Sequence, residues 1–313
     1  MNLKNFKIAI ITPVYEDKES FKMLCEDIER LALDVTVFAI DDGSVMNPLL
    51  RDNVSSFKKV NIKIIRLARN LGHQKAIAVG LNYVYHNYKD EFDFVVTMDS
   101  DGEDIPTQIS RLIESLVREK KDIAVASRKK RKETISFKFF YFLYKLIFKI
   151  LTGKKINFGN FIVFKTTVLK RIISMNEIWI HLAASVLLSK LRIAYIPTER
   201  GSRYRDKSKM NFVSLVLHGF RALMVFAEDV LVRIGLFSTF VAFLSIIGIV
   251  IAFILKIFGN ATPGWFSLVV GVLFVVFLLT GILSLISLML TGVLKNNTVS
   301  NINYEILIDE VYE

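Results

Sequence analysis

The first 130 residues alternate short apolar runs with stretches that have the spacing of amphipathic helices. The apolar runs contain few polar positions, as expected of strands that are buried on both faces of a parallel sheet. The predicted strands are Lys7–Val14, Val35–Asp41, Asn61–Leu67, Phe92–Met98 and Ile123–Ala126. The predicted helices are Glu19–Leu33, His73–Tyr85 and Thr107–Glu119, with a poorer one near Pro48–Phe57. This alternation predicts an α/β domain built on a doubly wound parallel sheet.

Two long uncharged stretches lie towards the C-terminal end of the sequence. Ile234–Leu255 contains 22 residues and Trp265–Leu294 contains 30, and neither includes a charged side chain. A helix needs about 20 apolar residues to cross a bilayer, so each stretch is long enough to span. The sequence therefore predicts a soluble domain followed by two transmembrane helices, at about residues 234–255 and 265–294.

Two further stretches are apolar but carry scattered charges. Residues 135–151 are crowded with Phe, Tyr, Leu and Ile, and Lys138, Lys145 and Lys149 fall on one helical face. The pattern is typical of a helix lying in the lipid headgroup layer, although a core helix with snorkelling lysines has the same pattern. Residues 211–232 read as a second mostly apolar, amphipathic helix that leads into the first span. The predicted organisation is a domain of residues 1–210, a juxtamembrane helix of residues 211–232, two spans within residues 233–295 and a tail of residues 296–313.

The charge is unevenly distributed along the chain. Apolar residues make up 52% of the sequence and charged residues 23%, with a net charge of +11. The spans, their connector and the tail together contribute −2, so residues 1–233 carry +13. A basic domain tethered to a bilayer suggests contact with anionic lipid or with phosphorylated substrates. No nucleic-acid-binding motif is present, so nucleic acid is not an expected partner.

The distribution of basic residues also predicts an orientation. Lys and Arg crowd the N-terminal domain, whereas the connector between the spans has only Lys256. The positive-inside rule therefore predicts an integral protein of the cytoplasmic (inner) membrane, with the domain and the C-terminus in the cytoplasm. The single cysteine, Cys25, excludes an intramolecular disulfide and fits a reducing compartment. The apolar stretch Ile8–Ile11 is too short for a signal peptide.

The sharpest local signal for chemistry is Asp99-Ser100-Asp101, at the end of a predicted strand. Residues i and i+2 of a strand point the same way, so both carboxylates are expected on one side. Converging carboxylates repel one another unless a cation lies between them, and hard oxygen ligands favour Mg²⁺ or Mn²⁺. Glu103 follows two residues later as a third candidate ligand. The alternative is a polar turn that caps the next helix.

Polar clusters also follow the other predicted strands. They are Tyr15-Glu16-Asp17, Asp41-Asp42-Gly43-Ser44 and Arg69-Asn70-Leu71-Gly72. Ligands of doubly wound sheets bind beyond the carboxyl ends of the strands, where these clusters lie. The Asp41 and Asp42 carboxylates could accept hydrogen bonds from a base or ribose, and Gly43 would let a ligand approach closely. Taken singly, the Asp41–Ser44 cluster is better explained as an ordinary turn, and Gly72-His73 as the start of a helix.

The order of these motifs changes the interpretation. Successive strands end in four motifs, which are Thr12-Pro13-Val14-Tyr15, then Asp-Asp-Gly-Ser, then Asn-Leu-Gly, then Asp-x-Asp. This succession resembles glycosyltransferase family 2, which implies the nucleotide-sugar-binding fold called GT-A. The predicted fold class is therefore an α/β, Rossmann-like GT-A domain with interfacial amphipathic helices and two C-terminal transmembrane helices.

A second resemblance lies further along the chain. Arg203-Tyr204-Arg205-Asp206-Lys207-Ser208-Lys209 is similar to the R-x-x-G-x-S-K segment of polyprenyl-phosphate glycosyltransferases, which include dolichol-phosphate mannose synthases and bactoprenol glucosyltransferases. Three positions depart from the family pattern. Asp206 replaces the glycine, Glu103 replaces a glutamine that helps to hold the metal, and Asn160 stands where many members have aspartate. The Q-x-x-R-W segment of processive polysaccharide synthases is missing.

The resemblance implies a role for individual residues. The nucleotide-sugar would be bound by Pro13, Tyr15, Asp17, Asp41, Asp42, Ser44, Asn70, Gly72 and Asp99. Mg²⁺ or Mn²⁺ would be held by Asp99, Asp101 and Glu103. The acceptor phosphate would be bound by Arg128, Arg203, Ser208 and Lys209. The residues expected to carry catalysis are Asp101, Arg128 and Arg203.

The expected activity is metal-dependent, inverting transfer of one sugar from a UDP- or GDP-sugar to a polyprenyl phosphate, such as undecaprenyl or dolichyl phosphate, at the cytoplasmic membrane face. One alternative is transfer to another lipid, such as the hydroxyl of a diacylglycerol, with Asp104 as the nearest spare carboxylate for a general base. A second is a catalytically silent membrane protein that binds a nucleotide-sugar. The sequence leaves open the sugar, the base, the polyprenol and whether the chain forms a homo-oligomer.

Overall fold

The structure is a computed structural model of the whole chain, and it describes residues 3–53, 57, 59–128, 135–205, 212–260, 262–296 and 302–312. Within these ranges some side chains, including that of Arg128, are not described. The chain divides into two compact units. Residues 1–142, 155–225 and 301–313 form the α/β unit, and residues 143–154 and 226–300 form the helical unit.

The α/β unit is built on an eight-stranded sheet with the order β7-β5-β6-β4-β1-β2-β3-β8. The strands are β1 Lys7–Val14, β2 Asp34–Asp41, β3 Asn61–Leu67, β4 Phe94–Thr97, β5 Ile123–Arg128, β6 Phe158–Lys165, β7 Ile193–Thr198 and β8 Ile308–Tyr312. All neighbouring strands are parallel except those that pair with β6 or β8, which are antiparallel. The five predicted strands are confirmed within two residues at each end, and the sheet is mixed rather than purely parallel.

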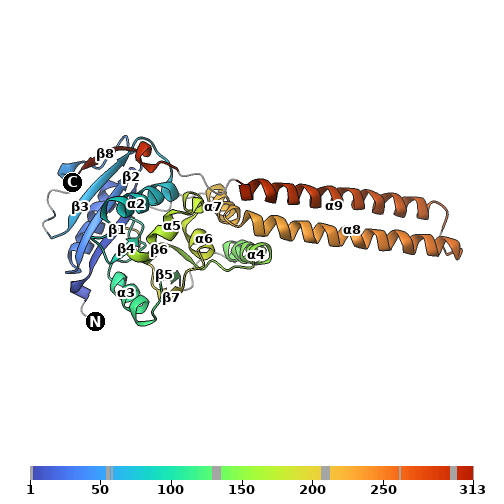
Figure 1. The fold of residues 1–313 in the computed structure, drawn as a ribbon, viewed down its shortest axis with the longest axis horizontal. Helices are drawn as coiled ribbons and strands as arrows, with labels where there is room; N and C mark the ends of the chain where they lie inside the picture. Colours follow the sequence, from blue (N-terminus) through green and yellow to red (C-terminus); the bar gives the residue numbers. More distant parts are fainter. Residues whose placement is uncertain are drawn as a thin grey trace. The chain divides into compact units, whose positions relative to one another are not determined.

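Helices cover both faces of this sheet, as the alternation predicted (Figure 1). On β1, Ile8 and Ile10 lie in the apolar cluster shared with α1 and α3, whereas Ala9 and Ile11 lie in the cluster shared with α2, α5 and α6. The helices of this unit are α1 Lys18–Glu29, α2 His73–Tyr88, α3 Gln108–Arg118, α5 Thr166–Ile173, α6 Leu182–Leu188 and α7 Phe212–Met224, with part of α4 Ile135–Thr152. Both faces are therefore buried, which explains why the strands are apolar throughout.

The predicted helix near Pro48–Phe57 is wrong for the described part of this stretch, which has one 3₁₀ turn, Arg51–Asn53. The backbone N–H of Leu50 donates to Asn53 Oδ1 at 2.9 Å. A short polar side chain that binds the backbone in this way favours a tight turn over a helix.

The C-terminal tail, predicted only as a tail, contains regular structure. A 3₁₀ turn, η4 Tyr304–Leu307, leads into β8, which pairs antiparallel with β3. Residues 308–312 therefore lie on the same side of any membrane as the α/β unit, as two spans require.

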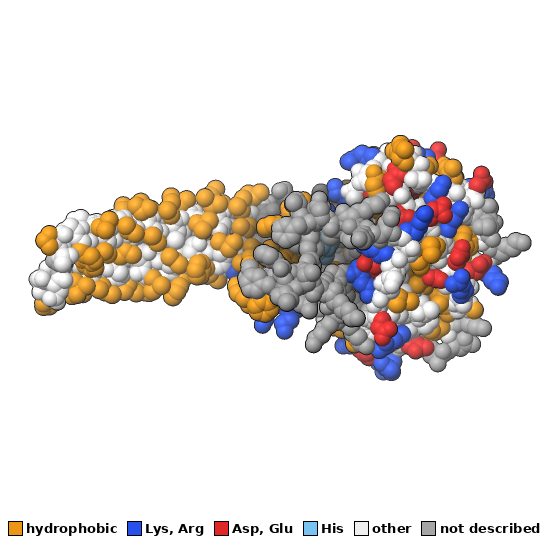
Figure 2. Space-filling view, turned by 180° about the vertical axis from the view of Figure 1, so that it is seen from behind, with side chains coloured by type: hydrophobic (Ala, Val, Ile, Leu, Met, Phe, Trp, Pro, Cys, Tyr) orange, Lys and Arg blue, Asp and Glu red, His pale blue; other side chains and the backbone are white. Residues whose placement is uncertain are grey.

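The helical unit contains the two predicted spans as α8 Ala227–Ile257 and α9 Trp265–Asn296. Both helices are long and apolar enough to cross a membrane, and Figure 2 shows hydrophobic side chains over the visible face of the pair. The helices pack against each other through small residues. Thr239 Oγ1 and Ser284 Oγ lie 3.1 Å apart, and Ser284 Oγ donates to the carbonyl of Gly235 at 3.1 Å. Small residues at such a contact let two apolar helices approach closely.

Two observations refine the predicted membrane-proximal segments. The stretch 211–232 is not one helix, because α7 ends at Met224 and α8 begins at Ala227. Glu228 and Asp229 lie in the first turn of α8, where carboxylates stabilise a helix N-terminus. On α4, the apolar side chains of Leu146, Ile147 and Ile150 are exposed.

Candidate active site

The ends of β1 and β2 are joined by the side chain of Glu16. Its Oε1 accepts the backbone N–H groups of Val45 and Met46 at 2.7 and 3.0 Å, and its Oε2 accepts that of Asn47 at 2.6 Å. In return, the backbone N–H of Glu16 donates to Ser44 Oγ at 2.9 Å. Glu16 has a φ of +51°, a left-handed conformation that is uncommon outside glycine. Three charge-assisted hydrogen bonds thus hold residues 45–47 beside the end of β1.

Asp41, the last residue of β2, holds the same loop from the other side. Its Oδ1 accepts the backbone N–H of Ser44 and its Oδ2 accepts that of Leu49, both at 2.9 Å. The side chain is fully buried. Burying a carboxylate is costly unless its oxygens accept hydrogen bonds, and here both do. The geometry therefore gives Asp41 a role in shaping the loop around the predicted nucleoside site.

Asp42 performs the equivalent task for the loop after β3. Its two oxygens accept the backbone N–H groups of Leu71 and Gly72, at 2.7 and 2.9 Å. Burial raises the pKa of the Asp42 carboxyl above its ordinary value, while these two donors act in the opposite direction. The predicted Asp-Asp pair thus supports two different loops at the same edge of the sheet.

The two loops touch through their backbones at Gly43. A Cβ on this residue would lie 2.4 Å from the carbonyl carbon of Arg69 and 2.6 Å from the backbone nitrogen of Asn70. Gly43 also has a φ of +67°, in the left-handed region. Only glycine combines this conformation with such a close approach.

Replacing Gly43 with alanine is therefore expected to separate the two loops. The Gly43→Ala variant should lose about 1–3 kcal/mol of unfolding free energy, because its Cβ collides with rigid backbone, and it should bind nucleotide more weakly. Thermal unfolding and nucleotide titration measure both effects. Gly259→Ala is the matched control, since Gly259 has a φ of +72° and its Cβ would meet nothing within 4 Å. Unchanged nucleotide affinity in Gly43→Ala would contradict the assignment.

The Asp99-Ser100-Asp101 turn follows β4 and is fixed to its surroundings. Ser100 Oγ donates to the carbonyl of Pro13 at 3.1 Å, and the backbone N–H of Asp99 donates to Asp104 Oδ2 at 2.9 Å. Burial, followed by the charge of Asp99, raises the pKa of Asp101 to about 6, although Arg203 opposes this shift. Two half-buried carboxylates in one turn form a donor set of hard oxygens, which fits Mg²⁺ or Mn²⁺.

Two arginines from the segment after β7 lie against this acidic turn. Arg203 Nη2 is 3.1 Å from Asp101 Oδ2, and Arg203 Nε donates to Glu103 Oε1 at 3.2 Å. Arg200 forms an ion pair with the other oxygen of Glu103. Glu103 is thus engaged by two guanidinium groups, and no group of three His, Cys, Asp or Glu side chains that could hold a metal is present among the described residues.

The backbone of the arginine segment runs directly along the acidic turn. The N–H of Gly201 donates to the carbonyl of Glu103 and that of Tyr204 donates to the carbonyl of Asp101, both at 2.9 Å. A Cβ on Gly201 would lie 2.2 Å from the carbonyl oxygen of Gly102. These contacts keep the two guanidinium groups beside the carboxylates.

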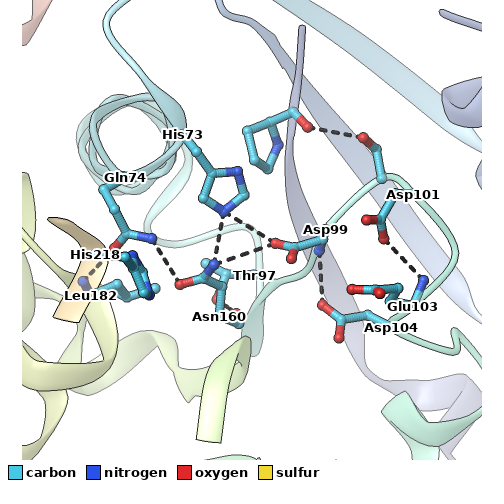
Figure 3. A network of polar contacts seen from close by, with 12 residues as sticks. His73, Gln74, Thr97, Asp99, Asp101, Glu103, Asp104, Asn160, Leu182 and His218 are labelled. Atoms are coloured by element: carbon cyan, nitrogen blue, oxygen red, sulfur yellow. Dashed lines mark hydrogen bonds and ion pairs between the residues drawn. The ribbon is translucent and has the colours of Figure 1, made fainter. Parts of the chain in front are cut away.

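A chain of amide groups reaches Asp99 from the other side (Figure 3). The backbone N–H of Leu182 donates to Gln74 Oε1 at 2.7 Å, and Gln74 Nε2 donates to Asn160 Oδ1 at 3.1 Å. Because a backbone N–H can only donate, this order fixes the orientation of both amides. Asn160 Nδ2 therefore faces Asp99 Oδ1 at 3.4 Å and His73 Nε2 at 2.8 Å. The network positions the carboxylate of Asp99.

His73 completes this arrangement at the start of α2. Its Nε2 lies 3.2 Å from Asp99 Oδ1. Burial lowers the pKa of His73, but the charge of Asp99 raises it, and the net shift is upward. Glu16, Arg200, His73, Gln74 and Asn160 all contact the predicted site, although the sequence did not assign any of them to it. The partners of these side chains lie far away in the sequence.

His181, the residue before α6, is a buried histidine outside this site. Its Nδ1 accepts the backbone N–H of Ala184 at 3.3 Å, and its Nε2 is 3.2 Å from His218 Nε2 on α7. Burial, together with the charges of His218 and Arg221, lowers the pKa of His181 to about 3. The folded chain therefore keeps this ring neutral.

This depressed pKa predicts acid sensitivity. Below the ordinary histidine pKa of about 6.5 the unfolded chain binds a proton that the folded chain does not, so stability falls as the pH drops. Between pH 6.5 and pH 5 the unfolding free energy of the α/β unit should fall by about 1.6 kcal/mol from this group, because the unfolded histidine is half protonated at pH 6.5 and the full slope is about 1.36 kcal/mol for each pH unit. Thermal unfolding across this range should show a weaker pH dependence in His181→Asn, which keeps a capping side chain. An unchanged slope would refute the assignment.

The remaining predicted residues lie as follows. Pro13 provides the carbonyl that Ser100 Oγ binds, and the side chain of Tyr15 is exposed. Asp17 caps α1 by accepting the N–H of Ser20 at 3.2 Å, and Asn70 lies in the loop against Gly43. Arg128 is the last residue of β5, with its side chain not described. Asp206, Ser208 and Lys209 lie outside the described residues.

Comparison with known proteins gives one consistent result. Residues 9–173, more than half of the chain, match the family described as glycosyl transferase family 2. An uncharacterised glycosyltransferase of Bacillus subtilis (strain 168), YkoT, is 25% identical over 85% of this chain and 81% of its own length. A prophage bactoprenol glucosyl transferase homolog of Escherichia coli (strain K12) is 26% identical over 86% of this chain and 88% of its own.

One further relative and one solved structure also match the chain. An undecaprenyl-phosphate 4-deoxy-4-formamido-L-arabinose transferase of Enterobacter sp. (strain 638) is 25% identical over 86% of this chain and 82% of its own. The crystal structure of glucosyl-3-phosphoglycerate synthase from Mycobacterium tuberculosis, in complex with Mn²⁺, UDP and phosphoglyceric acid, superposes with a TM-score of 0.50 at 12% identity, covering 72% of this chain and 79% of that one. The superposition confirms the expected GT-A fold. The chain is a glycosyltransferase that belongs to glycosyl transferase family 2.

Proposed function

We propose that this glycosyltransferase moves a single sugar from a UDP- or GDP-sugar to a polyprenyl phosphate, with inversion at the anomeric carbon. The observation that carries the proposal is the placement of Arg200 and Arg203 against the acidic turn at Asp101 and Glu103. An anionic acceptor needs such cations beside the place where the donor diphosphate binds. Relatives whose names state transfer involving undecaprenyl phosphate or bactoprenol match the chain over most of its length.

The donor would bind at the edge where β1, β2 and β3 end. Pro13, Tyr15, Asp17, Asn70 and Gly72 line this edge in the proposal. The buried Asp41 and Asp42, with Ser44, hold the surrounding loops through the hydrogen bonds described above. A loop that is already ordered binds a nucleotide at a lower entropic cost than a loop that must fold around it.

Asp99 and Asp101 would hold Mg²⁺ or Mn²⁺ against the diphosphate. When bound, such an ion stabilises the negative charge that develops on the leaving group. The amide chain through Gln74 and Asn160 orients Asp99 for this task. In this proposal Glu103 keeps its ion pairs with Arg200 and Arg203 and so holds the two guanidinium groups in place.

Arg203 and Arg200, with Arg128, Ser208 and Lys209, would bind the acceptor phosphate. One phosphate oxygen attacks the anomeric carbon, the bond from that carbon to the diphosphate breaks, and the nucleoside diphosphate leaves with the electron pair. A phosphate oxygen is already ionised at neutral pH, so this step needs no general base. The cations offset the repulsion between two phosphorylated substrates.

The hydroxyl-acceptor alternative needs a base, and Asp104 was the expected one. Its Oδ2 accepts the backbone N–H of Asp99 at 2.9 Å, which favours a role in holding the turn. The phosphate acceptor is therefore the better-supported proposal.

The membrane helices fit this acceptor, because an isoprenoid chain stays in the bilayer. In the proposal, α8 and α9 anchor the chain, α4 lies at the headgroup layer, and the α/β unit and C-terminus are cytoplasmic. The exposed apolar side chains of α4 at Leu146, Ile147 and Ile150 are consistent with this position.

The test is a transfer assay with the purified chain in membranes. The assay contains Mg²⁺ or Mn²⁺, undecaprenyl phosphate and a panel of radiolabelled UDP- and GDP-sugars, and label in the organic phase is counted. Undecaprenol and diacylglycerol serve as unphosphorylated acceptors in parallel reactions. We expect label to be extracted with one donor and only with the phosphorylated acceptor.

Other outcomes would replace the proposal. Label transferred to diacylglycerol or undecaprenol would identify a hydroxyl acceptor. Nucleotide binding without transfer to any acceptor from any donor would identify a binding protein.

A further inference from the structure

We propose that residues 302–312, called here the C-terminal segment, position the loop that borders the donor site. The inference rests on the proposed function for the identity of the donor, but its structural part can be tested without any substrate. The segment follows α9 in the sequence, yet it packs within the α/β unit. It contacts the chain on both sides of the loop formed by residues 68–72.

The first contact is with β3, the strand that leads into the loop. In the register of β8 with β3, Tyr312 is opposite Ile64, Glu310 is opposite Arg66, and Ile308 is opposite Leu67. The register shifts between Arg66 and Leu67, where the strand ends. β8 is the outermost strand of the sheet, so without it β3 would be an unpaired edge.

The pairing continues from the strand into the loop itself. The backbone N–H of Ala68, the first residue after β3, donates to the carbonyl of Leu307 at 3.0 Å. Leu307 and Ile308 also pack against the apolar cluster under α2. The segment therefore fixes the point at which the loop departs from the sheet.

The second contact is with α2, the helix that the loop leads into. The ring of Tyr304 stacks on His86 of α2, with centroids 5.4 Å apart and an angle of 15° between the planes. Tyr304 is 8% exposed and belongs to the same apolar cluster as α2. The C-terminal segment thus bridges β3 and α2, and only the loop lies between them in the sequence.

This loop is the one that the donor site uses. Asp42 accepts the N–H groups of Leu71 and Gly72, and Gly43 packs on the backbone of the residues before them. Elements with few buried contacts open locally at a low free-energy cost. Removing the bridge should therefore loosen the loop and weaken donor binding, while the groups around Asp101 stay in place.

The experiment compares the full-length chain in detergent or nanodiscs with two variants of the 3₁₀ turn. Tyr304→Ala removes the buried stacking ring, and Ile306→Ala is the matched control because Ile306 lies in the same turn and is 75% exposed. Hydrogen exchange is measured on the amides of Leu71 and Gly72 without ligand. Nucleotide affinity, KM for the donor and kcat are measured on the same samples.

We expect exchange at Leu71 and Gly72 to be about tenfold faster in Tyr304→Ala, with a donor KM about fivefold higher and kcat little changed. Ile306→Ala should match the parent chain, and Tyr304→Phe should restore both properties because Phe keeps the ring. Should Tyr304→Ala not fold, a chain that ends at residue 301 is tested with and without a synthetic peptide of residues 302–313. Restoration by the peptide is then the expected result.

Failure of this inference and failure of the proposed function give different experimental results. Unchanged exchange at Leu71 and Gly72 in Tyr304→Ala, or in the shortened chain without peptide, would overturn this inference whatever the enzyme does. A parent chain that binds neither UDP nor GDP would overturn the proposed function and leave the exchange result standing. If Tyr304→Ala lowered kcat about fivefold and left the donor KM unchanged, that result would also contradict a positioning role at the donor site.

Discussion

Replacing Asp101 with asparagine is expected to lower sugar transfer by about 10²–10³-fold, the usual cost of removing one electrostatic contact to a developing charge. Asparagine keeps the shape of the side chain and an oxygen that can accept the N–H of Glu103, which Asp101 Oδ1 accepts at 3.0 Å. What is lost is the negative charge that would hold the cation. The measurement is the rate of label transfer to polyprenyl phosphate at saturating donor.

The same variant should not lose stability, so a lower rate of sugar transfer can be attributed to the missing carboxylate and not to unfolding. Burial and the charge of Asp99 raise the pKa of Asp101 to about 6, so its ionised form is disfavoured in the folded chain. Removing this charge relieves repulsion with Asp99. The Tm without metal should therefore be equal or higher. We expect Mn²⁺ and nucleotide to raise the Tm of the parent chain, and this rise should disappear in the variant.

The control for this variant is Asp34→Asn, an exposed aspartate at the opposite end of β2. It loses the same charge far from the acidic turn and should transfer sugar at the parental rate. Transfer by Asp101→Asn at more than about a tenth of the parental rate would contradict the assignment, because that loss is only 1.4 kcal/mol in the activation barrier.

The strands that the sequence predicted share one physical property. β1 to β5 are buried apolar runs, and their short length and the turn residues that bound them distinguish them from buried helices. β8 has no such pattern, because its residues are mostly exposed and it pairs only at the edge of the sheet. Its position depends on pairing with β3, more than 200 residues earlier in the sequence. No local signal carries that information.

The candidate site likewise has features that the sequence predicts and features that it does not. The positions of Asp41, Asp42, Asp99 and Asp101 follow from their place at strand ends, since parallel strands bring those ends to one edge. The hydrogen-bond partners of these side chains could not be predicted from that position. Asp42 binds backbone N–H groups of a loop 29 and 30 residues away, which requires knowledge of how the loops pack.

Glu103 is the clearest example of this limit. Its role as a third metal ligand, which its spacing from Asp99 and Asp101 suggested, stays a prediction, and a spacing pattern contains no information about the arginines that approach from elsewhere. In the folded chain Arg203 and Arg200 come from a segment about a hundred residues later and engage both of its oxygens. Arg200 is close to Arg203 in sequence, so a search for basic residues three positions apart would have found it.

Replacing Arg203 with glutamine is expected to lower kcat/KM for the phosphorylated acceptor by about 10²-fold, a loss typical for one partner of a charge-assisted pair. Arg203 contacts Asp101 and Glu103 through two different nitrogens, at 3.1 and 3.2 Å. In the proposal, a cation at Asp101 would release Nη2 of this guanidinium for an anionic acceptor beside the donor, while Nε keeps its contact with Glu103. Arg203→Lys keeps the charge but not the planar fork, so it should lose about tenfold.

The decisive readout is a comparison of two acceptors for the same donor. In the proposal, water can accept the sugar in place of the lipid, and slow hydrolysis of the nucleotide-sugar would need the donor site and the cation but not Arg203. In Arg203→Gln, donor hydrolysis and nucleotide affinity should stay near the parental values while lipid transfer falls. Arg192→Gln is the matched control, because Arg192 forms its ion pair with Asp122 on the exposed surface. If hydrolysis, nucleotide affinity and lipid transfer fell together, Arg203 would belong to the donor site, and the acceptor phosphate would have to bind elsewhere.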